Sequence, residues 1–413
     1  MVYQPPSGAR DLLPLDVAQK HWIETRLEQV FQRWGYHRII TSTVESLETL
    51  MAGGAIDRDA VIGLQSVPGE QLGLRPELTA SIARTAVTRL TRVTHPQRLY
   101  YSANVFRRAD HGSHGGHQES YQSGVELLGA GSTWADAEIL LLLADCLNSL
   151  NLQNWQMILG DAGLTRSLLD AFPADVRQQV RDAIATLDQV ALETLPLSDQ
   201  LRQRALTLLN LRGHPENVLQ QISSLDLSAA EQERVSRLKT LISLLRQVTH
   251  QPQGPAPQLP AVILDLSLIQ TFDYYTGLTF EVVRRTDDGC QTLGQGGRYD
   301  NLLGVFHPSH KSFPGIGFVL SVEALHQVLL QGHQLPTDTE PSDWLVVPLQ
   351  PESAAAAFAY AQTIRDASTL VRVEVHLNPD QSQEAIRGIA KTRRIHRIAW
   401  IDQDGLPEIE TLH

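Results

Sequence analysis

Cysteine is scarce in this chain of 413 residues, and the little that occurs forms no pattern. Cys146 and Cys290 stand far apart, outside any Cys-x-x-Cys spacing. A disulfide framework needs several paired cysteines, and a thiolate zinc site needs closely spaced ones. Neither is indicated here, and we expect a protein of the reducing cytoplasm.

The chain also lacks a basic excess and long apolar runs. Its formal charge of −12 and its pI of about 5.7 oppose a broad basic face that would neutralise nucleic-acid phosphates. The strongest apolar run, Ile139 to Ala144, is far shorter than the roughly 20 residues that a membrane helix needs. The first residues, MVYQPPSGARDLLP, show no cationic segment followed by an apolar run, so no secretory signal is predicted. We expect a soluble protein with no membrane contact.

The first part of the chain alternates short apolar runs with glycine and proline, which predicts a mostly antiparallel sheet with helices. In the predicted helix over Trp134 to Leu150, the side chains of Asp136, Glu138 and Asp145 are expected to lie off the apolar face. The predicted elements are a helix over Ala18 to Trp34, strands over His37 to Val44, Arg98 to Val105 and Tyr121 to Leu128, and a helix over Trp134 to Leu150.

Aromatic residues are missing altogether between Phe172 and Phe272, where Leu, Gln, Arg and Ala dominate. Helical periodicity over Val176 to Leu187 and Ala229 to Val248 predicts an inserted helical bundle, which Pro173 can open and Pro196 and Pro215 interrupt. A proline-rich connection follows, and strands are expected to resume at Ala261 to Leu266 and Leu278 to Val283.

The tail after a polar connection at 331–342 predicts a small parallel sheet. Strand-like segments over 344–349, 370–375 and 397–401 alternate with helical segments over 354–367 and 383–392. Because the chain is too long for one compact core, we expect two or three domains. Their predicted bounds are 1–162 for the first part of a sheet core, 163–255 for the helical insertion, 256–330 for the second part of the core and 343–413 for the tail domain.

Four separated segments carry residues suited to binding a small polar molecule. A carboxylate and a hydroxyl, as in Glu77 and Thr79, suit an ammonium group, and Glu126 suits a ring N–H donor. Taken singly, each segment also has a plain structural interpretation, such as helix capping at Glu77 or a solvated strand position at Glu126. The segments are LRPELTA at 74–80, VFRRAD at 105–110 with YQSGVE at 121–126, LIQTFDYYTG at 268–277 and GQGGRYD at 294–300.

In this order the segments resemble the catalytic core of histidyl-tRNA synthetases. The resemblance implies a class II synthetase-like antiparallel sheet flanked by helices, an α+β fold with a helical insertion and a small C-terminal α/β domain like a truncated anticodon-binding domain. It also implies a histidine pocket. The matching residues are Glu77 and Thr79 at the α-amino group, Arg107 at the carboxylate and phosphate end, Gln122 and Glu126 lining the pocket, and Tyr274, Tyr275 and Tyr299 around the imidazole.

The departures from that family fall on the side of the catalytic reaction. Ala109 replaces a glutamate that helps to hold ATP, and Gln118 replaces a loop arginine that contacts the nucleotide. Gln270 replaces the catalytic arginine, and Ala324 replaces an ATP-clamping arginine. An arginine that stabilises transition-state charge in phosphoryl transfer is worth about 10³ to 10⁵ in rate. We therefore predict that histidine binding is kept and that synthetase activity is lost.

A histidyl-tRNA synthetase-like chain with these losses resembles the regulatory subunits of ATP phosphoribosyltransferase. The resemblance implies a non-catalytic subunit that joins a short-form catalytic subunit in the first step of histidine biosynthesis and mediates feedback inhibition by histidine. It implies a homodimer within a hetero-octamer, histidine as effector and no cofactor. Ser42, where that fold family places a proline in the dimer-forming strand, leaves the dimer geometry open.

Two other functions stay open at this point. One is a divergent but active histidine-tRNA ligase, and the other is a tRNA-binding or stress-sensing module, which the acidic charge disfavours. His111, His114 and His117 lie in a glycine-rich stretch without nearby cysteine, so we predict a polar loop and no metal site. The basic run from Arg387 to Arg397 is expected to be a solvated helix face, so tRNA binding is not expected.

Overall fold

The structure is a computed structural model that describes residues 4–6, 8–54, 56–65, 69–90, 94–108, 118–249, 259–268, 274–286 and 289–412. The chain forms two compact units, Met1–Leu335 and Pro336–His413, and each is described by itself. The finer division of the first unit at 162/163 and 255/256 stays a prediction.

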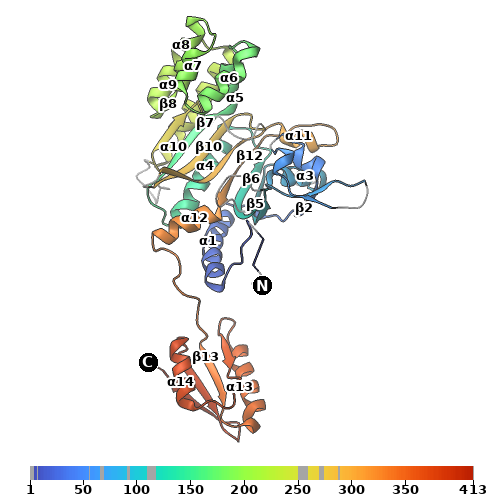
Figure 1. Cartoon of the computed structure of the whole chain (residues 1–413), viewed down its shortest axis with the longest axis vertical. Coiled ribbons are helices and arrows are strands. Elements are labelled where there is room, and N and C mark those ends of the chain that lie inside the picture. The colour runs from blue at the N-terminus through green and yellow to red at the C-terminus, as the bar shows by residue number, and fades with distance from the viewer. Residues whose placement is uncertain are drawn as a thin grey trace. The chain divides into compact units, whose positions relative to one another are not determined.

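A nine-stranded sheet crosses the first unit in the order β1-β5-β6-β12-β11-β10-β7-β9-β8 (Figure 1). Its centre, from β5 to β7, is antiparallel throughout, as predicted, whereas β1 pairs with β5 and β9 pairs with β7 in parallel. The strands are β1 (His37–Arg38), β5 (Gln97–Phe106), β6 (Glu119–Leu128), β7 (Trp155–Asp161), β8 (Arg212–Gly213), β9 (Val262–Asp265), β10 (Leu278–Thr286), β11 (Gly289–Arg298) and β12 (Gly315–Ser321).

The main hydrophobic core lies between this sheet and three helices, α1 (Pro14–Arg33), α4 (Thr133–Ser149) and α12 (Val322–Gln331). Alternate residues of a strand face opposite sides of the sheet. Val125 and Leu127 accordingly join this core, while Glu126 and Leu128 point to the other face. The predicted helices at 18–34 and 134–150 are confirmed.

The other face of the sheet carries a second apolar cluster built around α3 (Thr79–Arg89) and α11 (Leu302–Phe306). A three-stranded sheet of order β2-β4-β3 belongs to the same lobe. Its elements are β2 (Val44–Ser46), β3 (Gly63–Leu64), β4 (Leu72–Leu74), α2 (Leu47–Met51) and the short 3₁₀ helix η1 (Arg58–Ala60).

The prediction of one continuous strand over His37 to Val44 is wrong, because residues 39–43 do not form a strand. Strand β1 ends at Arg38, and the next strand begins at Val44 in a different sheet. The Arg75 guanidinium donates from Nη1 to the carbonyls of Thr41 at 2.9 Å and Ser42 at 3.2 Å. These two carbonyls accept hydrogen bonds from a side chain rather than from a neighbouring strand. The hydrogen-bond ladder between β1 and β5 therefore does not continue through them.

The prediction for Asp136 is also wrong. We expected this residue to lie off the buried face of its helix, yet only 5% of it is exposed. The Arg298 guanidinium binds the same carboxylate oxygen of Asp136 through Nε at 2.9 Å and Nη2 at 2.5 Å. A buried charge requires such a partner, and this one is distant in sequence.

The predicted insertion is helical; in Figure 1 its helices α6 to α9 stand above the sheet, whereas α10 lies beside it, next to α4. Its apolar side chains extend the main core rather than forming a separate one. Pro173 caps α6, α7 ends before Pro196, and Pro215 is the first residue of α9. The helices are α5 (Ala162–Leu169), α6 (Ala174–Ala185), α7 (Gln189–Thr194), α8 (Asp199–Leu209), α9 (Pro215–Ser223) and α10 (Ala229–Thr249).

The second unit contains the predicted parallel sheet in the order β14-β13-β15, extended by an antiparallel strand β16 that was not predicted. The basic run is paired within the unit, since Arg387 binds Glu410 at 2.8 Å and Arg393 binds Glu374 at 2.6 Å. The elements are β13 (Trp344–Pro348), η2 (Pro351–Ser353), α13 (Ala354–Ala367), β14 (Val373–Val375), α14 (Gln383–Thr392), β15 (Arg397–Ile401) and β16 (Pro407–Thr411).

Candidate functional site

The predicted binding residues meet in one cavity on the α3 face of the large sheet. The cavity has a volume of about 30 Å³, which is room for one or two water molecules. A ligand of amino-acid size therefore requires side chains to move. Glu77, Thr79, Arg107, Gln122, Glu126, Tyr274, Tyr275 and Tyr299 all line the cavity.

Glu77 lies at the N-terminus of α3, where the first backbone N–H groups have no partner within the helix. Its carboxylate accepts hydrogen bonds from the backbone nitrogens of Thr79 at 2.5 Å and Ala80 at 2.9 Å. The capping role is therefore confirmed, and it fixes a buried carboxylate at the cavity wall. Burial raises the pKa of Glu77, and the two N–H donors and the nearby Arg107 oppose that rise.

Glu126 lies at the centre of the cavity and is only 2% exposed, so its interpretation as a solvated strand residue is wrong. The Thr79 hydroxyl donates to Glu126 Oε1 at 2.8 Å, and the Tyr299 hydroxyl donates to Oε2. Burial raises the pKa of Glu126 to about 8, although both hydrogen bonds act in the opposite direction. A ligand that brings N–H donors to this carboxylate would stabilise its charged form.

The tyrosines form one edge-to-face group beside Glu126. The ring centroids of Tyr274 and Tyr275 lie 4.8 Å apart, and those of Tyr274 and Tyr299 lie 5.8 Å apart. Burial raises the pKa of all three hydroxyls, so they remain neutral hydrogen-bonding groups at physiological pH. A flat polar ring is a suitable ligand for such a wall.

Glycines in the neighbouring strands explain how these large side chains lie flat on the sheet. A Cβ at Gly297 would stand 2.7 Å from the Tyr275 ring. A Cβ at Gly317 would overlap the Glu126 carboxylate. The glycines of GQGGRYD and of GIG at 315–317 therefore act by close packing against the site, a role that glycine alone can fill.

Six lining residues were not predicted as binding residues: Leu78, Tyr101, Gln295, Gly317, Phe318 and Val319. Tyr101 is buried against Gly124 of the next strand, where a Cβ would stand 2.6 Å from its hydroxyl. The alignment of Tyr101 with Gly124 across β5 and β6 is the signal, and it appears only once the strands are in register. Gln295 stands within the recognised glycine-rich segment.

Of the four positions where the sequence departs from the synthetase catalytic site, two lie among the described residues. Gln118 lies at the start of β6, where its carbonyl accepts from the Arg107 backbone nitrogen at 2.9 Å. Ala324 lies in the first turn of α12 and packs against the main core. Ala109 and Gln270, like the histidines at 111, 114 and 117, lie outside the described residues.

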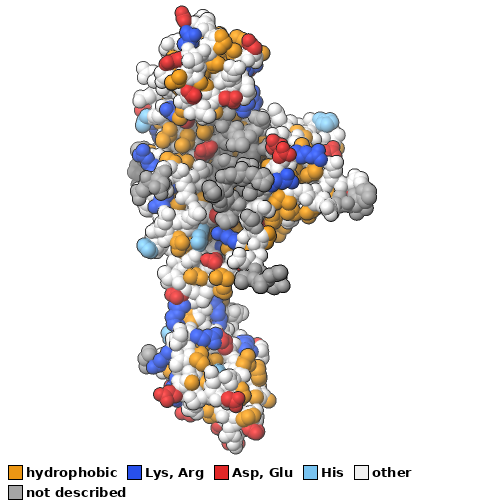
Figure 2. Space-filling view, viewed as in Figure 1, with side chains coloured by type: hydrophobic (Ala, Val, Ile, Leu, Met, Phe, Trp, Pro, Cys, Tyr) orange, Lys and Arg blue, Asp and Glu red, His pale blue; other side chains and the backbone are white. Residues whose placement is uncertain are grey.

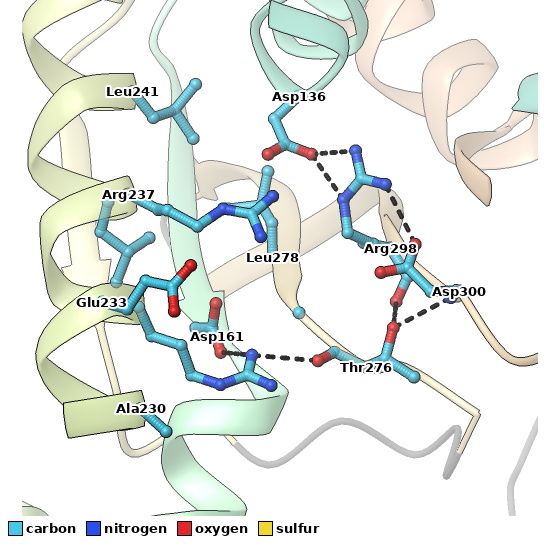
Figure 3. A pocket seen from close by; sticks show the side chains of 13 residues that line it. Asp136, Asp161, Ala230, Glu233, Arg237, Leu241, Thr276, Leu278, Arg298 and Asp300 are labelled. Carbon is cyan, nitrogen blue, oxygen red and sulfur yellow. Dashed lines mark hydrogen bonds and ion pairs between the residues drawn. The ribbon is translucent and has the colours of Figure 1, made fainter. Parts of the chain in front are cut away.

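A second cavity, of about 220 Å³, lies between α10 and the core (Figure 3). Three of its carboxylates are paired with arginines: Asp136 and Asp300 bind Arg298, and Asp161 lies 3.3 Å from Arg234. Glu233 and Arg237 of α10 complete the charged lining. No motif of the sequence predicted this cavity.

Comparison with known proteins places the chain in a family. The family model described as histidyl-tRNA synthetase matches residues 8–325. The ATP phosphoribosyltransferase regulatory subunit of Nostoc sp. is 58% identical, over 99% of both chains, and that of Picosynechococcus sp. is 55% identical, over 100% of both. The chain belongs to the family of ATP phosphoribosyltransferase regulatory subunits.

Solved structures agree with this family assignment and with the predicted class II synthetase-like fold. An ATP phosphoribosyltransferase regulatory subunit/histidyl-tRNA synthetase from Bacillus halodurans superposes with a TM-score of 0.80 at 25% identity, covering 97% of this chain and 99% of that one. The histidyl-tRNA synthetase of Nostoc sp. gives a TM-score of 0.77 at 20% identity, covering 100% and 97%. The second match concerns the fold alone. The regulatory-subunit family therefore shares its architecture with the synthetases.

The described residues include neither a membrane-spanning helix nor a cluster of metal ligands. No described helix is long and apolar enough to cross a membrane. Within the same residues, no three His, Cys, Asp or Glu side chains come together in a way that could hold a metal ion. That the protein needs no cofactor stays a prediction.

Proposed function

We propose that this chain is a non-catalytic regulatory subunit of ATP phosphoribosyltransferase that is required for the first step of histidine biosynthesis and mediates feedback inhibition by bound histidine. The observation that carries the proposal is the meeting of all the predicted histidine-binding residues in one cavity. The regulatory-subunit relatives, similar over their full length, support it.

The cavity offers complementary groups to each part of histidine. Glu77 and Thr79 provide a carboxylate and a hydroxyl for the α-amino group, and Arg107 provides a cation for the carboxylate. Glu126, with Tyr275, provides acceptors for the imidazole N–H groups. A site built from buried hydrogen-bonding groups discriminates strongly against ligands that leave those groups unpaired.

The synthetase reaction is proposed to be lost. The apolar methyl group of Ala324 offers no charge to a nucleotide phosphate, and Gln118 is neutral where the synthetases have an arginine. The alternative, a divergent active histidine-tRNA ligase, predicts histidine-dependent exchange of pyrophosphate into ATP. We expect no exchange above background, and measurable exchange would favour the ligase.

The proposed partner is a short-form catalytic subunit of ATP phosphoribosyltransferase, in an assembly of homodimers within a hetero-octamer. Mixing the two purified subunits should give one larger species by analytical ultracentrifugation, raised phosphoribosyltransferase activity and inhibition by histidine. Absence of all three effects would overturn the proposal. Calorimetry on the isolated chain tests histidine binding separately.

RNA recognition is not expected. On the face shown in Figure 2, basic side chains are scattered among acidic ones, whereas nucleic-acid binding favours a continuous basic surface. A cytoplasmic location is proposed on the strength of two free thiols, Cys146 and Cys290, and of the biosynthetic role.

A further inference from the structure

The segment Tyr274–Gly277 lies between the two cavities and belongs to both. The side chains of Tyr274 and Tyr275 line the histidine cavity, whereas Thr276 and Gly277 line the second cavity beside α10. A displacement of the tyrosines by a ligand therefore reaches the second cavity through only one or two peptide units.

The backbone carbonyls of this segment are held by the helical insertion. Arg234 of α10 donates from Nη1 to the Thr276 carbonyl at 3.1 Å, and Arg166 of α5 donates to the Tyr275 carbonyl at 3.3 Å. Gly163 provides the space, because a Cβ there would stand 2.5 Å from the Arg234 guanidinium carbon and 2.6 Å from the Thr276 oxygen. Both insertion arginines thus reach the peptide next to a predicted ligand-binding tyrosine.

The opposite side of the segment is anchored in the core. The Thr276 backbone nitrogen donates to the Arg298 carbonyl at 2.8 Å. The Arg298 side chain is 3% exposed and is bound to Asp136, whereas the Arg234 side chain is 37% exposed beside Asp161. An ion pair with one partly exposed partner rearranges more easily than a fully buried one. Movement of the segment should therefore be transmitted to the insertion and not to the core.

The volumes of the two cavities also favour a displacement toward the helical insertion. The histidine cavity, at about 30 Å³, must enlarge to admit an amino acid, whereas about 220 Å³ lies open beside α10. α10 also packs apolar side chains, among them Val235 and Leu245, into the main core, and close-packed side chains resist displacement. The open volume beside Arg234 therefore gives room for a small shift on the polar side of α10.

We propose that the helical insertion senses occupation of the histidine cavity through Arg234 and Arg166, which bind the carbonyls of Thr276 and Tyr275, and transmits it as a displacement of α10. This inference rests on the proposed histidine-sensing function and adds the element that carries the signal. Arg234 and Arg166 act as positioning residues, because they touch the site's backbone and not the ligand.

The test compares Arg234→Gln with Arg237→Gln in the complex with the short-form catalytic subunit. Arg237 lies one turn further along α10 and lines the same cavity, but its guanidinium binds the Gly131 carbonyl. Allosteric coupling typically changes affinity about 5- to 150-fold. We expect histidine to inhibit the wild-type and Arg237→Gln complexes alike, and the Arg234→Gln complex to lose most of that inhibition while calorimetry still shows histidine binding. Equal inhibition in both variants would overturn the proposal.

Hydrogen exchange on the unmodified protein gives a readout that needs no variant. Added histidine should change the exchange of amides in 229–240 of α10 and in 274–277, and leave those of α13 unchanged. If calorimetry shows that histidine binds but exchange in α10 stays the same, the insertion does not carry the signal. If histidine does not bind at all, the proposed function itself fails, and this inference fails with it.

Discussion

The two cavities on either side of Tyr274–Gly277 hold their buried carboxylates in different ways. Glu126, in the smaller cavity, is held by the neutral hydroxyls of Thr79 and Tyr299. Asp136, in the larger one, is held by the Arg298 guanidinium, with contacts at 2.5 and 2.9 Å. A carboxylate held by neutral donors can still gain from a ligand that brings N–H groups or positive charge, whereas one held by an arginine already has its countercharge.

The difference in carboxylate partners distinguishes a binding site from a structural site. Both cavities nevertheless contain acidic residues and adjoin the segment Tyr274–Gly277. Pocket size alone would favour the larger cavity as the ligand site. Charge pairing favours the smaller one, because its Glu126 carboxyl is held by hydroxyl donors and can gain from a ligand that brings N–H groups.

Breaking the buried pair of Arg298 and Asp136 should give the largest effect, a loss in the free energy of unfolding. In Arg298→Met the Asp136 carboxylate would remain buried without its countercharge, and removal of one partner of a buried pair costs about 3–5 kcal/mol. Urea unfolding followed by circular dichroism measures the change. A loss below about 1 kcal/mol, the range of exposed pairs, would show that the pair is not effectively buried.

A matched double variant distinguishes charge from packing. Asp136→Leu combined with Arg298→Met removes both charges, and replacement of a whole buried pair by apolar groups is often neutral or stabilising. The double variant should therefore be more stable than Arg298→Met alone. If it is less stable, Asp136 contributes to stability by something other than its pairing with Arg298.

Glu126→Gln should weaken histidine binding with little loss of stability. The amide keeps the size of the side chain but not the charge, and hydrogen bonds to charged groups contribute about 1.5–3 kcal/mol. The dissociation constant should rise by about 10- to 150-fold, as measured by calorimetry. Gln295→Ala, at the same cavity but away from Glu126's hydrogen bonds, should have a smaller effect, and the reverse order would place the imidazole elsewhere.

The pH dependence of histidine binding should follow Glu126. In the free protein this carboxyl is protonated below its pKa of about 8. Imidazole N–H donors favour the charged carboxylate, so binding lowers the pKa and releases a proton. Affinity should therefore rise between pH 7 and 8, by at most about tenfold per pH unit, and level off above. Glu126→Gln should abolish this rise, and a slope that survives the substitution would assign the proton to another group.

The sequence predicted best those elements whose signals are local. Helices α13 and α14 have the same bounds in the structure as in the prediction, because each combines a helical apolar repeat with a start signal such as the Ser382 cap. The binding residues were predicted from the resemblance of four separated segments to histidyl-tRNA synthetases, and the structure brings them into one cavity.

The predictions that failed depended on distant partners. The strand after His37 stops because Arg75 takes the carbonyls of Thr41 and Ser42. Asp136, on α4, is buried because Arg298 of β11 pairs with it. Periodicity along one segment holds no information on such pairs, and so the second cavity could not be predicted either.

The smallest effect should come from removing the second unit. Both cavities are lined by residues of the first unit, and the apolar clusters of Pro336–His413 contain only residues of that unit. A chain ending at Leu335 should keep its fold, and its dissociation constant for histidine should stay within about twofold of that of the full chain, or about 0.4 kcal/mol. Calorimetry on the two proteins, with circular dichroism as the control for folding, measures the difference. Weaker binding by a folded truncated chain would mean that the second unit influences the histidine cavity, and the contrast drawn between the two cavities would then be incomplete.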